Sequence, residues 1–290
     1  MGLFLNPTSE AAKRIKSALI ISFAGKRAFM KNFVLLAALF LSQISPVQAR
    51  DLPEILNSGT LRVGTTGDYP PLTECNQRMQ CSGFAIDLAE SLGKYLSKLY
   101  AQPVKVKYIN TNWPDLSTDL KNDRFDIAMG GISYSDSRAR DFLLSDGITP
   151  CGKVALIRKE FFPQVTGLND LALIAALNRS EVRVVENPGG LNLVFAEQHL
   201  PNAQLIITAN NKEPFLVLRE DKADVMITDL IEARYRLKKN PSLTIVNPAM
   251  FTETRSHKVF MMQKNSRKLA DQVNIWLGKT NIDDLKKKWF

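Results

Sequence analysis

Residues 123–138 read DRFDIAMGGISYSDSR, and this stretch indicates both a fold and a binding site. A short apolar run, as in a buried strand, ends at a pair of glycines. Ser133, Ser135 and Arg138 then add side-chain hydrogen-bond donors beside the strand end. Because a guanidinium group can donate to both oxygens of a carboxylate at once, the stretch predicts a carboxylate site. The alternative is a tight turn followed by a solvated surface arginine.

Strand and helix signals alternate around this stretch. Strands are expected at 60–66, 104–109 and 125–129, and again at 181–186, 204–207 and 223–229. Helices are expected between them, for example where Ile86, Leu88, Leu92, Leu96 and Leu99 recur at helical spacing. Two successive βαβαβ units predict an α/β protein with two lobes, each a mainly parallel sheet flanked by helices.

The order of these elements also predicts the domain boundaries. The first lobe is expected to comprise residues 50–153 and 258–290, and the second lobe residues 154–257. Residues 258–262 would return the chain to the first lobe. There a terminal helix would pack through Leu269, Val273, Ile275, Trp276 and Leu277.

Ligands of open α/β sheets bind beyond the carboxyl ends of the strands, so a ligand cleft is expected between the lobes. The expected ligand-binding residues are Tyr69, Trp113, Gly131, Ser133, Ser135, Arg138, Gly190, Asn192 and Asp229. Tyr69 and Trp113 would form walls, or simply pack in a turn and a core. The loop 187–192 would present backbone N–H groups to an anion, or form a plain turn. Asp229 would bind an ammonium group, or cap the next helix.

The N-terminal residues 1–49 have the pattern of a cleaved signal peptide. Basic residues precede the apolar run 33–41, and 47–49 form a small-x-small cleavage site. Met30 is expected to be the start of the protein, which would leave residues 1–29 as an extension. The apolar run is too short to span a bilayer, so no stable membrane insertion is expected after cleavage. A membrane anchor is the alternative if cleavage fails.

Charge, histidine and cysteine content narrow the function further. Residues 1–49 hold six of the 38 basic residues and one of the 29 acidic residues, so the remaining chain carries a net charge of +4 rather than +9. No basic stripe interleaved with aromatic residues remains, which argues against nucleic acid as a partner. The two histidines, His199 and His257, lack ligand spacing, and we expect no metal and no cofactor.

The export signal favours a disulfide between Cys75 and Cys81, which close a short loop. Two free thiols are the alternative. Cys151 is left over, and its pairing with either of the others stays open.

The two-lobed order, Arg138 after Gly-Ile-Ser and Asp229 in Ile-Thr-Asp resemble the family 3, amino-acid type, periplasmic solute-binding proteins. The resemblance implies a type II periplasmic binding protein fold, a location in the periplasm and an ABC permease as a possible partner. It also implies that Arg138 holds the carboxylate of the ligand and Asp229 its amino group.

Longer motifs resemble the cyclohexadienyl dehydratases, catalytic members of the same fold. They lie at 65–69, 113–116, 123–129, 187–192 and 222–229. The resemblance implies a carbon–oxygen lyase of phenylalanine biosynthesis, which removes water and carbon dioxide from prephenate or arogenate. That reaction needs a proton donor beside the departing hydroxyl.

The expected proton donor is missing from the sequence. The dehydratase pattern has threonine and glutamate where this chain has Leu191 and Leu193, and leucine cannot donate a proton. Glu186 or Glu213 would be substitutes, but both are expected to be surface charges. The sequence therefore slightly favours non-catalytic binding of a small amino acid or keto acid, with the dehydratase as the alternative.

Overall fold

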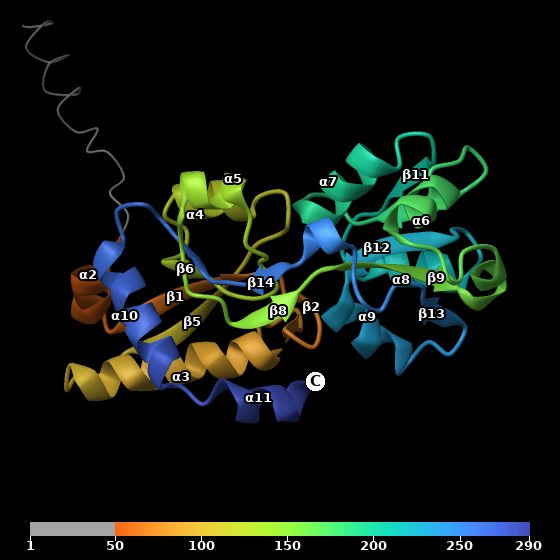
Figure 1. Cartoon of the computed structure of the whole chain (residues 1–290). Helices are drawn as coiled ribbons and strands as arrows, with labels where there is room; N and C mark the ends of the chain where they lie inside the picture. Colours follow the sequence, from red (N-terminus) through yellow and green to blue (C-terminus); the bar gives the residue numbers. More distant parts are fainter. Residues whose placement is uncertain (1–49) are drawn as a thin grey trace, which may run out of the picture. The chain divides into compact units, whose positions relative to one another are not determined.

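The computed structural model describes residues 50–290 (Figure 1). The expected signal peptide, the Met30 start and the membrane-anchor alternative lie outside the described residues. Within residues 50–290 no helix is long and apolar enough to cross a membrane. Two five-stranded sheets organise this part of the chain, and we call each sheet with its covering helices a lobe.

The first lobe is built on a mixed sheet. Its strands are β1 (Thr60–Thr65), β5 (Lys105–Asn110), β6 (Ile127–Ala128), β7 (Leu143–Leu144) and β15 (Met261–Met262). Its helices are α2 (Leu52–Ser58), α3 (Phe84–Leu99), α4 (Leu116–Lys121), α5 (Asp136–Asp141), α10 (Arg267–Lys279) and α11 (Ile282–Trp289). The strand order is β5-β1-β6-β15-β7. β5, β1 and β6 run parallel, and β15 is antiparallel to β6 and β7.

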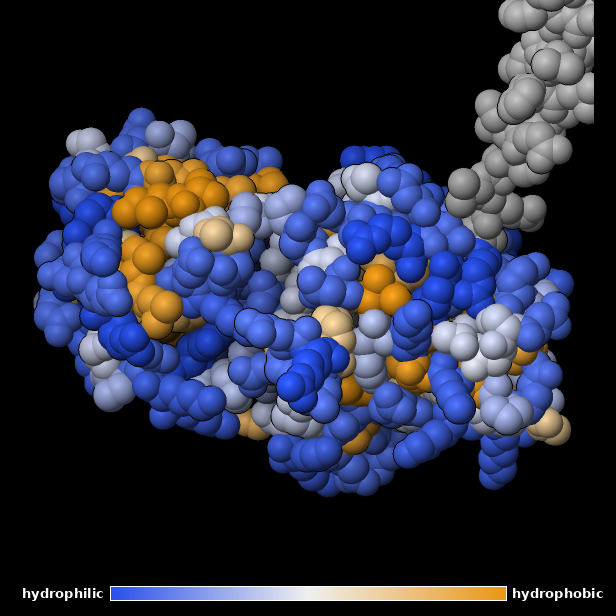
Figure 2. Space-filling model, turned by 180° about the vertical axis from the view of Figure 1, so that it is seen from behind, coloured by the Kyte–Doolittle hydropathy of each residue, from blue (hydrophilic) through white to orange (hydrophobic). Residues whose placement is uncertain are grey.

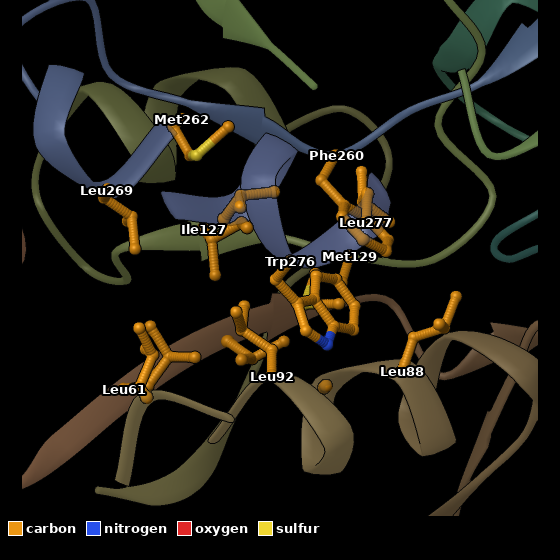
Figure 3. Close-up of a cluster of buried hydrophobic side chains, with 14 of the residues drawn as sticks. Leu61, Leu88, Leu92, Ile127, Met129, Phe260, Met262, Leu269, Trp276 and Leu277 are labelled. Carbon is orange, nitrogen blue, oxygen red and sulfur yellow. The ribbon is translucent and has the colours of Figure 1, made fainter. Parts of the chain in front are cut away.

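Apolar side chains on both faces of the first sheet explain its two helical layers. Successive strand residues point to opposite faces. Ile127 and Met262 therefore join the core beneath α3 and α10, while Ala128 and Met261 pack with α4. Figure 3 shows the larger core, where Trp276 of α10 lies over the leucines of α3.

The second lobe repeats the plan. Its strands are β9 (Lys153–Arg158), β10 (Arg183–Glu186), β11 (Gln204–Ile207), β12 (Val225–Asp229) and β13 (Leu243–Ile245). Its helices are η1 (Lys159–Gln164), α6 (Asp170–Leu177), α7 (Gly190–His199), α8 (Glu213–Arg219), α9 (Leu230–Leu237) and η2 (Thr252–Thr254). The order is β11-β10-β12-β9-β13, with β9 antiparallel to β12 and β13. α6 and α7 cover one face, and α8 and α9 cover the other.

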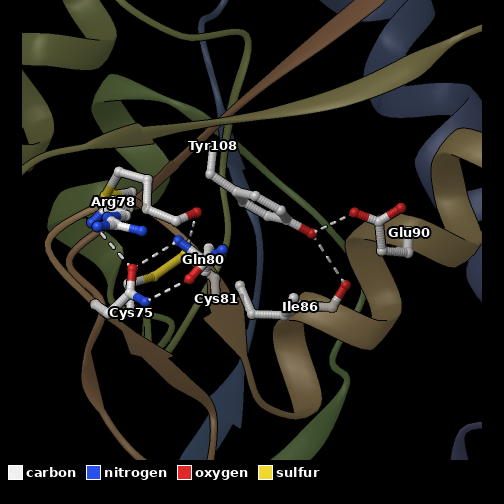
Figure 4. The surroundings of a disulfide bond; sticks show 9 residues. Cys75, Arg78, Gln80, Cys81, Ile86, Glu90 and Tyr108 are labelled. Carbon is white, nitrogen blue, oxygen red and sulfur yellow. Dashed lines mark hydrogen bonds between the residues drawn. A yellow bond between two sulfur atoms is a disulfide. The ribbon is translucent and has the colours of Figure 1, made fainter.

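Two further small sheets complete the described chain. β8 (Thr149–Cys151) and β14 (Ser256–Lys258) pair antiparallel where the chain passes between the lobes (Figure 1). β2 (Asp68–Tyr69), β3 (Thr73–Cys75) and β4 (Cys81–Ser82) form a three-stranded sheet. Cys75 and Cys81 are joined by a disulfide across it (Figure 4). Cys151 is buried and unpaired in the described chain.

Three details differ from the pattern in the sequence. The strand expected at 125–129 has ladder bonds only at Ile127–Ala128. Leu99 is 48% exposed because α3 ends there, and Ile275 is 44% exposed. Ile275 is exposed because the buried stripe of α10 runs through Leu269, Val273 and Trp276, which leaves position 275 on the other side of the helix.

The surface of the second lobe exposes several large apolar side chains, including Leu171, Leu205 and Ile207. Figure 2 shows apolar residues gathered on part of the face seen from behind. Folded proteins commonly expose such side chains, so these residues carry no functional argument by themselves.

Candidate ligand-binding cleft

A small pocket lies at the strand ends and is lined by residues of both lobes. The predicted residues that line it are Tyr69, Trp113, Gly131, Ser133, Arg138, Gly190, Asn192 and Asp229. Ser135, predicted to bind the ligand, is not among the described residues that line this pocket. Its Oγ instead accepts a hydrogen bond from the backbone N–H of Arg138 (3.3 Å) and caps α5.

Arg138 points into the pocket rather than into open solvent. Its Nη1 donates to the carbonyl oxygen of Ser133 (2.7 Å). Its Nε and Nη2 have no hydrogen-bond acceptor within the described residues. Burial lowers the pKa of Arg138, while the nearby charge of Asp229 opposes that shift. Half of the guanidinium fork is thus available to an anion that enters the pocket.

The glycine pair before Arg138 allows the pocket wall to pack closely. Gly131 has a φ of 82°, and a Cβ there would lie 2.8 Å from Cδ1 of Tyr69. Only glycine fits both the backbone conformation and this contact. The Tyr69 ring meets Trp113 edge to face at 5.5 Å, and Trp113 Nε1 donates to Asp68 (3.2 Å). The two aromatic residues therefore form one wall of the pocket.

Asp229 ends β12 and is 4% exposed. It precedes α9, but its side chain makes no capping hydrogen bond to that helix. Its Oδ2 accepts hydrogen bonds from the hydroxyl of Tyr69 and from Nζ of Lys258. Its Oδ1 is buried and has no partner within residues 50–290. Burial alone would raise the pKa of Asp229, but the ammonium groups of Lys258 and Lys153 hold it below the ordinary value.

Two buried lysines were missed in the sequence. Lys258 is 3% exposed, and its Nζ also donates to Gly131 O (2.7 Å) and Ser133 Oγ (3.0 Å). Lys153 is 7% exposed, and its Nζ donates to Asn192 Oδ1 (2.7 Å). Burial lowers the pKa of Lys153, and the charge of Asp229 opposes this. The sequence holds one indication that these lysines are buried, because each directly precedes an apolar run.

Glu186 is not the surface charge that the sequence suggested. It ends β10 and is fully buried, and the backbone N–H of Ile227 on the neighbouring strand donates to its Oε1 (2.7 Å). Burial raises its pKa well above the ordinary value, and the charge of Lys153 only partly offsets this. Glu186 does not line the pocket. Glu213 is partly exposed and accepts a hydrogen bond from the N–H of Ala209 (2.8 Å).

The two leucines on α7 differ in position. Leu191 lines the pocket, whereas Leu193 is not among the described lining residues. Asn187, Gly189 and Asn211 also line it. Within residues 50–290 Asp229 is therefore the single carboxyl group in the pocket wall, beside the cations of Arg138 and Lys153. Such a wall can bind an anion, and the lowered pKa of Asp229 keeps that carboxyl ionised.

The described residues contain no cluster of three or more His, Cys, Asp or Glu side chains that would hold a metal ion. Nothing in the pocket wall therefore suggests a metal ligand set.

Comparison with known proteins identifies one family model and several related proteins that match most of this chain. The model of the bacterial extracellular solute-binding proteins, family 3, matches residues 61–290. Cyclohexadienyl dehydratase of Pseudomonas aeruginosa is 36% identical over 220 residues, covering 73% of this chain and 76% of that protein. The L-cystine-binding protein of Escherichia coli K12 is 24% identical over 278 residues, covering 93% and 97%.

Solved structures support the same fold. An ancestral amino-acid-binding protein, described as a precursor of cyclohexadienyl dehydratase, has a TM-score of 0.72 at 30% identity. The match covers 82% of this chain and 98% of that one. A substrate-binding protein of an amino-acid ABC transporter from Streptococcus pneumoniae, bound to L-arginine, has a TM-score of 0.71 at 19% identity. The match covers 82% of this chain and 97% of that one and supports the fold alone. The two-lobed α/β fold predicted from the sequence is confirmed.

Proposed function

Because the chain belongs to the bacterial extracellular solute-binding proteins of family 3, we propose that it is a non-catalytic receptor for a small amino acid or keto acid. Arg138 would hold the carboxylate of the ligand, helped by Ser133 and by the backbone N–H groups at the start of α7. The observation that carries this proposal is the half-unpaired guanidinium fork of Arg138 in the pocket wall.

The proposed receptor works in the periplasm after removal of its signal peptide and delivers its ligand to an ABC permease. We assign residues 50–153 and 258–290 to the first lobe and residues 154–257 to the second, except that Lys153 itself begins β9 and counts with the second lobe. The paired strands β8 and β14 would then act as the hinge. Ligand contacts from both lobes would favour the closed arrangement.

Dehydration of prephenate or arogenate is the second candidate, because a cyclohexadienyl dehydratase is 36% identical. The reaction needs an acid that donates a proton to the departing hydroxyl. Among the described lining residues the only carboxyl is Asp229, and its lowered pKa leaves it without a proton at neutral pH. Burial raises the pKa of Glu186, but its carboxyl lies outside the pocket wall. These two facts favour binding over dehydration.

Incubation of the purified protein with prephenate and with arogenate separates the two functions. We expect no formation of phenylpyruvate or phenylalanine above the acid-catalysed background. We also expect calorimetry with small amino acids and keto acids to detect binding with a Kd of about 1 μM or tighter, equivalent to roughly 8 kcal/mol. Enzymatic turnover of either compound would overturn the receptor proposal.

Replacing Arg138 by alanine tests the carboxylate site. Arg138→Ala should weaken ligand binding by about 100-fold, because removing a buried charged hydrogen-bonding partner costs about 2–5 kcal/mol. Arg140→Ala is the control, since Arg140 lies on the same helix and is exposed. It should change the affinity less than about twofold. Equal affinities of the two variants, both folded by circular dichroism, would place the ligand elsewhere.

A further inference from the structure

The cleft between the lobes contains more positively charged than negatively charged side chains. Arg138, Lys153 and Lys258 meet there, and Asp229 is the one carboxyl of the described lining residues. Lys258 and Asp229 form an ion pair with each other. The ammonium of Lys258 also donates to Gly131 O and Ser133 Oγ, so all three of its protons are used. Two cations, Arg138 and Lys153, are left to face the pocket.

Lys153 is a buried residue of the second sheet and not a surface charge. It begins β9 and pairs with Asp229 in the antiparallel register of β12. The side chain is 7% exposed, and its single hydrogen bond among the described residues goes to Asn192 Oδ1 (2.7 Å). An ammonium group buried with one neutral hydrogen-bond acceptor is costly, and the nearby charge of Asp229, which makes no hydrogen bond to it, offsets that cost only in part. A ligand anion would supply that missing partner.

Asn192 completes a receptor for an anion. Its Oδ1 accepts from Lys153, so its Nδ2 is available as a donor, and Nδ2 has no partner within the described chain. Asn192 is 9% exposed and lies in the first turn of the ten-residue helix α7. The positive end of the helix dipole favours negative charge at this place. An ammonium, an amide N–H₂ and a helix N-terminus thus converge on the pocket.

We propose that Lys153 and Asn192 bind a second carboxylate, and that the ligand of this protein is a small dicarboxylate. The inference rests on the proposed receptor function and names its ligand class. Arg138 holds one carboxylate from the first lobe, and Lys153 with Asn192 holds the other from the second lobe. Each of the two carboxylates of the ligand would then face one of these two cations.

The free oxygen of Asp229 favours an acidic amino acid over a dicarboxylic keto acid as the ligand. Its Oδ1 is buried and unpartnered within residues 50–290, so it can accept one hydrogen bond from the ligand. The ammonium of an acidic amino acid would donate to it. A dicarboxylic keto acid without a donor would leave Oδ1 unpaired, which would cost affinity. An acidic amino acid is therefore expected to bind more tightly than the keto acid of the same skeleton.

The test compares ligands that differ only in one charge. The protein is unfolded and refolded to remove bound ligand and then titrated with L-glutamate and L-glutamine, and with L-aspartate and L-asparagine. In at least one pair the acid should bind about 10- to 100-fold more tightly than its amide, as one charged hydrogen bond gives about 1.5–3 kcal/mol. Titration with 2-oxoglutarate and oxaloacetate reports the contribution of the amino group, and L-arginine should not bind.

Lys153→Met links this preference to the proposed residue. The variant should lose the preference for the acid and keep the affinity for the amide within about threefold. Lys222→Met removes the same charge from an exposed site on the second lobe and should keep the preference. Equal binding of acid and amide by the wild-type protein, binding of L-arginine, or an unchanged preference in Lys153→Met would overturn the dicarboxylate inference. Loss of all binding in Arg138→Ala would still support the receptor function in those cases, whereas turnover of prephenate would contradict the receptor function itself.

Discussion

At the scale of single residues, burial decides which charges are functional. Arg138 and Lys153 line the pocket, and each keeps N–H groups that have no acceptor in the described chain. In Lys258, by contrast, all three N–H groups donate, to Asp229 and two further oxygens. Glu186 is the opposite case, because its buried carboxyl receives one hydrogen bond and lies behind the pocket wall. An unpaired cation in a pocket can bind an anion, whereas burial raises the pKa of a carboxyl that forms no ion pair.

Glu186 should make the stability of the protein depend on pH. Burial raises its pKa in the folded state, whereas the unfolded chain has the ordinary value of about 4.3. Above that value the folded state binds more protons than the unfolded state, so this contribution to stability is lost as the pH rises. Glu186→Gln stays neutral and should gain about 1 kcal/mol or more over the wild type between pH 5 and pH 8.

Urea denaturation at a series of pH values measures this difference. Glu197→Gln is the control, because Glu197 is exposed on α7. The free energy of unfolding of this variant should stay within about 0.5 kcal/mol of the wild-type value at every pH. A constant difference between Glu186→Gln and the wild type across this range would mean that Glu186 is ionised in the folded protein.

At the scale of elements, the start of α7 brings the second lobe against the first. Gly189 precedes the helix with a φ of 70° and lies so close to the backbone at Trp113 and Pro114 that a Cβ would collide with it. The same turn presents Gly190, Leu191 and Asn192 to the pocket. One helix terminus therefore both contacts the opposite lobe and contributes to the anion site.

Gly189→Ala should weaken ligand binding by about tenfold, equivalent to roughly 1.4 kcal/mol. A Cβ at this position would lie 2.7 Å from the nitrogen of Pro114 and force the turn away from the first lobe. Gly167→Ala is a matched control, because Gly167 has a φ of 74° but a Cβ there would have no neighbour within 4 Å. Both variants should lose about 1 kcal/mol of stability from backbone strain. Calorimetry should find reduced affinity in Gly189→Ala alone, and equal affinities would show that this contact does not affect binding.

At the scale of the whole molecule, the described chain joins two similar sheets through the paired strands β8 and β14. The pocket takes Arg138 and Tyr69 from one lobe and Asn192 and Asp229 from the other. The hydrogen bond from Tyr69 to Asp229 already connects the lobes. A ligand in the pocket therefore adds contacts to both lobes at once.

Ligand binding should accordingly stabilise the molecule as one unit. At a ligand concentration 100-fold above Kd the free energy of unfolding rises by about 2.7 kcal/mol. For a chain of this size that raises Tm by roughly 5–10 °C. Differential scanning calorimetry should show this shift for the wild type and a shift of only about 1 °C for Arg138→Ala at the same concentration, because 100-fold weaker binding leaves about 0.4 kcal/mol. A ligand-dependent shift in only one of two separate transitions would contradict binding across the lobes.

Local patterns made much of the fold and part of the site predictable. An apolar run followed by glycine and polar residues marks a strand end wherever it occurs, and this places Arg138 and Asp229 in the pocket wall. The amphipathic pattern of α3 and α10 identified most of the core positions, and the exceptions Leu99 and Ile275 lie at a helix end and off the buried stripe. These signals depend on neighbours within one or two turns of chain.

The sequence by itself determined the alternation of strands and helices in the two βαβαβ units, the glycine turn before Arg138 and the charge of each candidate residue. Tertiary structure alone decided the state of those charges. Lys258 meets Asp229, Lys153 meets Asn192 and Glu186 meets the backbone of Ile227 only through folding. The physical reason is that desolvation and ion pairing depend on groups brought together from distant positions, and no local pattern encodes which buried charge finds a partner.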